Sequence, residues 1–449
     1  MPSPQMTAAR YRIAWIVERV DYNVASFRYR SLIPAYELSA SGTQSIFTTI
    51  DAVSVTDADF FIFVKVFGPK HLDFAAALYR AGRPYILDLC DNIFWADYAP
   101  KRAIGGRDNF LQMAVQASAI VVTCNALAKV ACEYLPQNQV PIVIPDAAFS
   151  LQDHLDISAW FDAMQVARRW SGHKFLTSSD AGQLATRPWR GRISRSLRYL
   201  LAPSEAIAAA KRLLLKRAIS SATAAASQVQ RPQPGSAQRQ RRRKLIWFGK
   251  HGTTYSKAGM QSLTTIIPHL IAINSLVPIE LVIISNNRAK FHDRLLRLPF
   301  PTRYRAWSNE TVFKELRGSD VFLMPNETDG FSACKSANRA VMSLEMGVPV
   351  IATRLDSLEP LTDAIVIDDW QRGLENYLLH DGERGKALAQ ASKVIDAVYA
   401  RKVVAERWLD LARISQERRQ AMPPFAPIMA ASAGTEVVAG TGPLRAQVG

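Results

Sequence analysis

The sequence has 449 residues, of which 48% are hydrophobic and 21% are charged, with a formal net charge of +16. That length leaves room for two or three domains, and the apolar share indicates buried cores rather than a chain disordered throughout. No apolar run approaches the roughly 18 residues of a spanning helix, and no apolar stretch typical of a secretory signal precedes the first predicted strand. We therefore expect a cytoplasmic protein that does not span the membrane.

The cysteines do not form a recognisable ligand set. They lie far apart on segments that read as strand ends or helices, without the spacing of metal ligands. These four residues are Cys90, Cys124, Cys132 and Cys334. We expect free thiols and no zinc.

Positive charge is concentrated in one segment. Between Arg168 and Lys244 there are 18 lysines and arginines against two acidic residues, which accounts for the whole net charge. An anionic partner is therefore expected to contact this segment. The segment lacks the interleaved aromatic residues of a nucleic-acid stacking platform, so the sequence disfavours nucleic acid and leaves an anionic membrane surface as the candidate for residues 168–244.

Two parts of the chain share one pattern. Short apolar strands alternate with helical stretches from Tyr11 to Pro145, and the alternation restarts after Lys244. This rhythm is typical of parallel sheets with helices on both faces. The part between them has no convincing strand, contains one plausible basic helix at 204–219, and ends in a low-complexity stretch. We predict two α/β domains at 1–150 and 244–420, a basic and partly disordered insertion at 151–243, and a disordered tail at 421–449.

In the second α/β domain a predicted strand, loop and helix follow one another, an order that is typical of a nucleotide-binding site. The predicted strand at 320–325 runs into a polar loop, and a predicted helix follows from Lys335. Lys335 and Arg339 are four residues apart, so they would share one face of the first helical turns, where free amides and the helix dipole favour an anion. Two cations at such a helix end suit a diphosphate. The alternative is that both are solvated surface charges.

The order of these motifs resembles the GT-B glycosyltransferases of the "glycosyl transferases group 1" type. The resemblance rests on Lys335-Ser336-Ala337-Asn338-Arg339, which is similar to a K-S-x-N-[KR] motif, and on the glycine-led strand at 347–353. It implies two Rossmann-like domains facing across a cleft, a nucleotide-sugar donor, a retaining reaction and no metal or other cofactor. It also implies these donor-binding residues: Gly249, Lys250, Gly252, Ser332, Lys335, Asn338 and Arg339.

Further segments agree with this resemblance. Ser26, Arg28 and Arg30 open a stretch that resembles the R-x-R-x3-P-x3-L-x3-G start of related enzymes, which makes them candidates for the acceptor side of the cleft. Arg28 could instead pair with an acidic neighbour and hold a helix. Asp88 and Asp91 resemble the family's "D-x-x-D-x-x-[FW]" segment and are catalytic candidates, although either could cap a turn.

Asp329 is the third catalytic candidate. It precedes Gly330 in the loop that is expected to face the donor sugar, where a carboxylate can accept hydrogen bonds from hydroxyl groups. It could equally be a turn residue.

The sequence departs from the family at one pair of positions. An E-x7-E pair is replaced by Cys334 and Met342, and the second of these glutamates typically holds the ribose of the nucleotide. Glu345 lies nearly one helical turn further on, where it could compensate in part or be a surface charge.

The resemblance implies a glycosyltransferase that moves a sugar to a glycan or lipid-linked acceptor in polysaccharide or cell-envelope biosynthesis, with contact to the inner face of the membrane. The alternatives are a catalytically inactive nucleotide-binding or glycan-binding protein of the same fold, and a nucleic-acid-binding protein. The residues assign neither the sugar nor the catalytic base.

Overall fold

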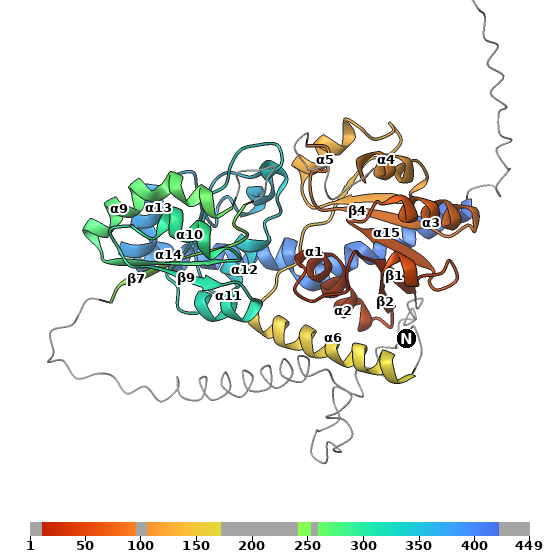
Figure 1. Ribbon diagram of the computed structural model, residues 1–449, viewed down its shortest axis with the longest axis horizontal. Helices are drawn as coiled ribbons and strands as arrows, with labels where there is room; N and C mark the ends of the chain where they lie inside the picture. Colours follow the sequence, from red (N-terminus) through yellow and green to blue (C-terminus); the bar gives the residue numbers. More distant parts are fainter. Residues whose placement is uncertain (1–10, 96–105, 172–240, 253–258, 422–449) are drawn as a thin grey trace, which may run out of the picture.

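The computed structural model describes residues 11–95, 106–171, 241–252 and 259–421, which form two domains joined side by side (Figure 1). The predicted tail at 421–449 and the predicted helix at 204–219 lie outside these residues, apart from residue 421 itself. Each domain is built on a parallel sheet of six strands. The prediction of two Rossmann-like units is therefore confirmed.

The first sheet has the strand order β2-β1-β3-β4-β5-β6. Its central strands, β3 (Phe60–Val64) and β4 (Tyr85–Leu89), are buried at every position. Continuous burial of this kind is what a parallel strand covered on both faces requires. The remaining strands are β1 (Arg12–Ile16), β2 (Gln44–Thr48), β5 (Ala119–Val122) and β6 (Ile142–Val143).

Helices connect and cover these strands. After β1 and a loop come a short helix, a π-helical turn and a further helix that follow one another without a break. The other helices separate successive strands. In chain order they are α1 (Ala25–Phe27), η1 (Arg28–Leu32), α2 (Ile33–Ser39), η2 (Ile50–Ala52), α3 (Pro69–Arg80), α4 (Gly106–Gln116), α5 (Asn125–Cys132) and α6 (Leu151–Ser171).

The second sheet has the order β12-β11-β10-β7-β8-β9. Its strands are β7 (Arg243–Phe248), β8 (Ile279–Ser285), β9 (Thr302–Ala306), β10 (Val321–Met324), β11 (Val350–Ala352) and β12 (Val366–Ile367). Strand β11 begins just after Gly347, whose φ of 72° ends the preceding helix in a conformation that only glycine adopts without strain.

The helices of the second half follow the same alternation until the last strand, after which the chain is helical. They are η4 (Met260–Ile266), α9 (Ile267–Leu276), α10 (Arg288–Leu295), α11 (Asn309–Leu316), η5 (Ser332–Cys334), α12 (Asn338–Glu345), η6 (Asp356–Leu361), α13 (Trp370–Leu379), α14 (Asp381–Val394), η7 (Ile395–Tyr399) and α15 (Arg401–Ala421).

The first domain extends beyond its predicted end at residue 150. Helix α6 begins at Leu151, where we predicted the insertion to start, but it packs on the first domain. The ring of Phe161 lies 5.6 Å from that of Phe27, and Trp160 lies 5.4 Å from Tyr36. These aromatic contacts make at least the first half of α6 part of the first domain's core.

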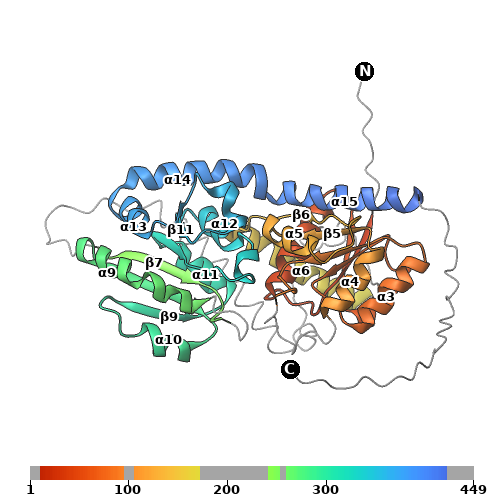
Figure 2. The same ribbon diagram turned by 90° about the horizontal axis from the view of Figure 1, so that it is seen from above.

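The last helix moves the other boundary. Helices α14 and α15 run along one side of both domains, so the chain returns to the first domain at its end (Figure 2). Trp408 of α15 packs edge-on against Trp15 of β1 at 5.5 Å. Arg401 forms ion pairs with Glu37 at 3.2 Å and with Asp153 at 2.8 Å. The second domain therefore ends before α15, not at residue 420.

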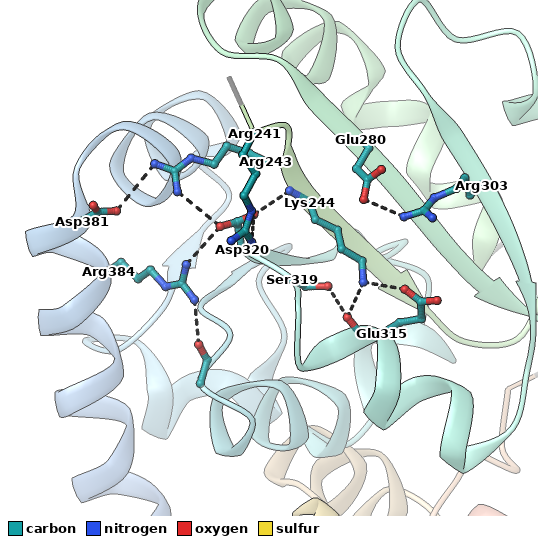
Figure 3. A network of polar contacts seen from close by, with 11 residues as sticks. Arg241, Arg243, Lys244, Glu280, Arg303, Glu315, Ser319, Asp320, Asp381 and Arg384 are labelled. Carbon is teal, nitrogen blue, oxygen red and sulfur yellow. Dashed lines mark hydrogen bonds and ion pairs between the residues drawn. The ribbon is translucent and has the colours of Figure 1, made fainter. Parts of the chain in front are cut away.

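A polar network fixes the start of β7, where the chain enters the second domain (Figure 3). The buried carboxylate of Asp320 accepts a hydrogen bond from the backbone N–H of Lys244 at 2.7 Å. It also pairs with Arg243 at 3.5 Å, Arg384 at 3.4 Å and Arg241 at 3.9 Å. One carboxylate thus faces three guanidinium groups at the amino edge of the sheet.

Among the helices that the structure describes, none combines the length and the apolar character required to cross a bilayer.

Candidate functional site

The carboxyl edges of the two sheets meet. The amide of Asn92, which follows β4, donates to the carbonyl of Gly330 after β10 at 2.9 Å. The backbone N–H of Ala126 donates to Asp356, which follows β11, at 2.8 Å. Ligands of open parallel sheets bind at this edge, so the residues that follow the strands of both domains form the candidate site.

Lys335 does not lie on the helix that the sequence predicted. Helix α12 begins at Asn338, and Lys335 is extended with a ψ of 145° after the short turn η5. Asp329 is the reason, because its carboxylate accepts from the N–H groups of Phe331 and Ser332 at 3.0 Å each and from the Ser332 hydroxyl at 2.8 Å. Asp329 thus behaves as the turn residue of our alternative, and the predicted shared helical face of Lys335 and Arg339 is wrong.

Lys335 instead crosses to the first domain. Its ammonium group lies 2.5 Å from a carboxylate oxygen of Asp91, and Lys65 forms an ion pair with the other oxygen of the same carboxylate. Burial would raise the pKa of Asp91, but the attraction of Lys335 and Lys65 outweighs it and holds this pKa well below its usual range. Asp91 is therefore ionised and bound to both lysines.

Arg339 has no counter-ion among the residues that the structure describes. Its Nη1 reaches the carbonyl of Phe248 at 3.3 Å, and a Cβ added at Gly249 would lie 3.1 Å from the same nitrogen. Within the described part of the chain no carboxylate forms an ion pair with Arg339, and burial lowers its pKa to about 10. The group still carries its charge at neutral pH, so an anion would be favoured beside it.

The glycine turn after β7 closes on itself. The N–H of Met260 donates to the carbonyl of exposed Lys250 at 3.2 Å. Gly259 has a φ of 119°, and a Cβ there would lie 2.6 Å from the backbone nitrogen of Gly252. Only glycine fits this approach. The turn thus brings Gly249, Lys250 and Gly252 to the side of the site where Arg339 lies.

Asp146 is a site residue that the sequence reasoning missed. It follows β6, and its Oδ2 accepts from Ser336 at 2.7 Å and from Asn338 at 3.0 Å, both in the second domain. A carboxylate directly after a short apolar strand was the available signal. The predicted donor residue Asn338 therefore contacts the first domain here, and Ser332 is buried against Asp329.

Arg30 and Asp88 form a buried pair beneath the site. The side chain of Asp88 is 0% exposed and that of Arg30 is 1% exposed, and the two approach to 2.7 Å. The second terminal nitrogen of Arg30 reaches the Ile144 carbonyl at 2.7 Å and Asp146 at 3.3 Å. Neither Arg30 nor Asp88 presents a surface to a ligand, which departs from the predicted acceptor-side and catalytic positions.

Arg28 is buried as well. Its Nη1 donates to the Tyr22 carbonyl at 2.9 Å, and its guanidinium lies 5.1 Å from the Tyr29 ring and 5.6 Å from the Phe149 ring. The pairing with an acidic residue that we considered for Arg28 is made by Arg30. Ser26, in contrast, is half-buried in the short helix α1.

The two positions at which the resembled family has glutamates lie in apolar surroundings. Cys334 and Met342 are both buried, and Glu345 is exposed. The sequence reasoning did not select Glu327, whose carboxylate accepts a hydrogen bond from the Ser262 hydroxyl at 3.1 Å beside the glycine turn. Its signal was its position directly after β10.

A second contact between the domains involves His154 of α6. Its Nδ1 lies 2.7 Å from the Tyr22 hydroxyl, and its Nε2 lies 3.7 Å from a carboxylate oxygen of Glu310 on α11. The interaction with His154 lowers the pKa of Glu310 to about 2. Within the described ranges no three His, Cys, Asp or Glu side chains come together as a metal site would require.

The comparison with solved structures identifies the fold, whereas the comparisons of sequence find no match. No protein-family model matches the sequence, and a sequence search of the curated proteins finds no match. The structure is similar to Anabaena Alr3699/HepE in complex with UDP-glucose, with 11% identity, a TM-score of 0.51, and coverage of 89% of this chain and 99% of that one.

Two further solved structures are similar over a comparable extent. An α,α-trehalose-phosphate synthase (UDP-forming) from Burkholderia vietnamiensis has 9% identity, a TM-score of 0.52, and coverage of 92% of this chain and 99% of that one. A glycosyltransferase from Rickettsia africae has 10% identity, a TM-score of 0.50, and coverage of 90% and 98%. The predicted GT-B fold is therefore confirmed.

Proposed function

We propose that this protein is a glycosyltransferase that takes a sugar from a nucleotide-sugar donor. The observation that carries the proposal is Arg339, a charged and half-buried group that faces Gly249 without a carboxylate partner among the described residues. A donor diphosphate would supply the missing negative charge. The similar proteins support this assignment, because the Anabaena structure is a complex with UDP-glucose.

The proposed chemistry uses charge stabilisation. When the sugar leaves the donor, negative charge grows on the nucleoside diphosphate, and cations that face this charge lower the barrier. Arg339, Lys250 and Lys335 are the proposed cations. Gly249 and Gly252 are the proposed donor-binding glycines of the turn, and Gly249 leaves no room for a side chain beside Arg339. The proposed step uses no metal.

Two carboxylates, Asp91 and Glu327, remain candidates on the sugar side. We propose that Asp91 lies beside the reacting groups, because it is held at the edge of the site by Lys335 and Lys65. Asp329 shapes the loop that holds Lys335, and buried Asp88 acts through Arg30 rather than by touching a sugar. Glu327 is the additional candidate for donor hydroxyl groups. The retaining outcome stays a prediction, which NMR of the product's anomeric proton would decide.

Thermal-shift measurements test the donor site directly. UDP, GDP, ADP and their sugars are added to the wild type, to Lys335→Ala/Arg339→Ala, and to a control variant, Lys402→Ala/Arg413→Ala, which removes two exposed cations of α15. Ligand binding to the native state raises Tm. We expect one nucleotide to stabilise the wild type and the control but not the site variant.

Two results would contradict the proposal. If no nucleotide shifts the Tm of the wild type, the protein has no donor site of this kind. If the site variant is stabilised as much as the control, the nucleotide binds elsewhere.

We propose a glycan or lipid-linked acceptor and contact with an anionic membrane surface through residues 168–244. Most of this segment lies outside the described residues, but its described end supports the proposal, because Arg241, Arg243 and Arg384 outnumber the carboxylates of Asp320 and Asp381 with which they pair (Figure 3). Sedimentation with phosphatidylglycerol vesicles should capture the full chain and lose most of it after deletion of 172–240. Equal capture after the deletion would contradict the assignment, and binding to duplex DNA instead would favour the nucleic-acid alternative.

A catalytically inactive binding protein is the second candidate function. It is favoured by one observation, the replacement of the family's glutamate pair by buried Cys334 and Met342. Release of free sugar or transfer to an acceptor from the nucleotide sugar that binds would exclude it.

A further inference from the structure

Asp91 joins two lysines from different domains. Lys335 comes from the loop before α12, and Lys65 follows β3 in the same domain as Asp91. Lys65 has a φ of 57°, a left-handed backbone conformation that is uncommon for a residue with a side chain. Such conformations persist where the surrounding structure enforces them, and they are frequent at functional sites.

The three charges are placed so that one cation can leave. The carboxylate of Asp91 is 14% exposed, whereas the side chains of Lys65 and Lys335 are about one third exposed. A mostly buried carboxylate without any paired cation destabilises the folded state. With Lys65 in place, Asp91 keeps a counter-ion when Lys335 moves.

We propose that Asp91 is a positioning residue that holds Lys335 while the donor site is empty and releases it to the donor diphosphate, with Lys65 remaining as the counter-ion of Asp91. The inference rests on the proposed function. A diphosphate carries more negative charge than one carboxylate, so it competes for the ammonium group. Donor binding then breaks the ion pair between Asp91 and Lys335, which joins the domains at this point.

Substitutions of Asp91 and of Lys65 should act in opposite directions. Asp91→Asn removes the competitor, so the nucleoside diphosphate found by thermal shift should bind about two- to fivefold more tightly, the size that a part-exposed ion pair supports. Lys65→Met removes the alternative counter-ion, so Asp91 holds Lys335 more firmly and the same ligand should bind more weakly by a similar factor. Isothermal titration calorimetry at fixed salt measures both.

A double-mutant cycle tests whether Lys335 carries the effect. In a Lys335→Met background, Asp91→Asn should no longer improve affinity. Asp59→Asn is the matched control, because Asp59 is a part-buried carboxylate of the same domain that pairs with Arg12 at 3.0 Å at the opposite edge of the sheet. The control should leave nucleotide affinity unchanged. Tm without ligand shows that each variant is folded.

Several outcomes would overturn the inference. Weaker or unchanged binding by Asp91→Asn means that Asp91 does not compete with the donor, and a tenfold loss would indicate that it contacts the donor itself. An equal gain in the Lys335→Met background would mean that only the overall charge matters. If the wild type binds no nucleotide, the proposed function itself fails, and this inference fails with it.

Discussion

The guanidinium of Arg30 joins Asp88 and Asp146, at 2.7 Å and 3.3 Å, and Asp146 in turn accepts hydrogen bonds from the second domain. A buried ion pair in the core of one domain is therefore continuous with the contact between the domains. Arg30 and Asp88 are buried, so they contact the site only through Asp146.

Removal of Arg30 should be strongly destabilising. Arg30→Met leaves Asp88 buried without its cation, and breaking such a pair costs about 3–5 kcal/mol. We expect urea unfolding of the variant to show a loss of this size in the free energy of unfolding. Arg19→Met, which removes an exposed cation paired with Asp21 at 3.4 Å, is the control and should change stability by less than about 1 kcal/mol. Similar losses in both variants would contradict the prediction.

Glu310 should contribute to acid sensitivity. Its interaction with His154, 3.7 Å away, lowers its pKa from 4.5 to about 2. A carboxyl group whose pKa is depressed in the folded state stabilises the protein above its unfolded pKa, and this contribution is lost as the pH falls from about 4.5 towards 2. Glu310→Gln should therefore lose stability at pH 7 and show a shallower decline below pH 5. Unfolding curves at pH 3, 4.5 and 7 measure this, and parallel declines would refute the assignment.

The glycine turn should not accept a side chain. Gly259→Ala places a Cβ 2.6 Å from the Lys250 carbonyl oxygen at a φ of 119°, so the turn must open. We expect loss of nucleotide binding and a lower Tm. Gly385→Ala is the control, because a Cβ there meets nothing within 4 Å and alanine is the better helix former within α14. Calorimetry with the bound nucleotide distinguishes them, and unchanged affinity in Gly259→Ala would count against the turn's proposed role.

A side chain at Gly330 should also be destabilising, but for a different reason. A Cβ there would lie 2.7 Å from the ring of Trp95 in the other domain, so Gly330→Ala must separate the two loops or displace the ring. Overpacking of this kind costs about 1–3 kcal/mol. Gly318→Ala, whose Cβ would come no closer than 3.9 Å to Lys244, is the control. Limited proteolysis and Tm should both show the difference, and equal behaviour of the two variants would argue against close contact between the domains here.

The sequence by itself determined the local elements and their order. The continuous apolar run of β3 and the restart of the strand rhythm at β7 depend only on short-range patterns, so they predicted two parallel sheets. The carboxyl ends of the parallel strands of one sheet lie at one edge, so the sequence also placed the polar residues after β4 and after β10 at this edge of their own domains.

Only the tertiary structure decided which of these residues meet. Arg30 and Asp88 are 58 positions apart, and no local pattern distinguishes a buried pair from two exposed cleft residues. Lys335 leaves the predicted helix because three hydrogen bonds to Asp329 close a turn first, and α15 belongs to the first domain because its tryptophan is buried against β1. Burial and long-range pairing depend on how the domains pack, and a one-dimensional pattern does not contain that information.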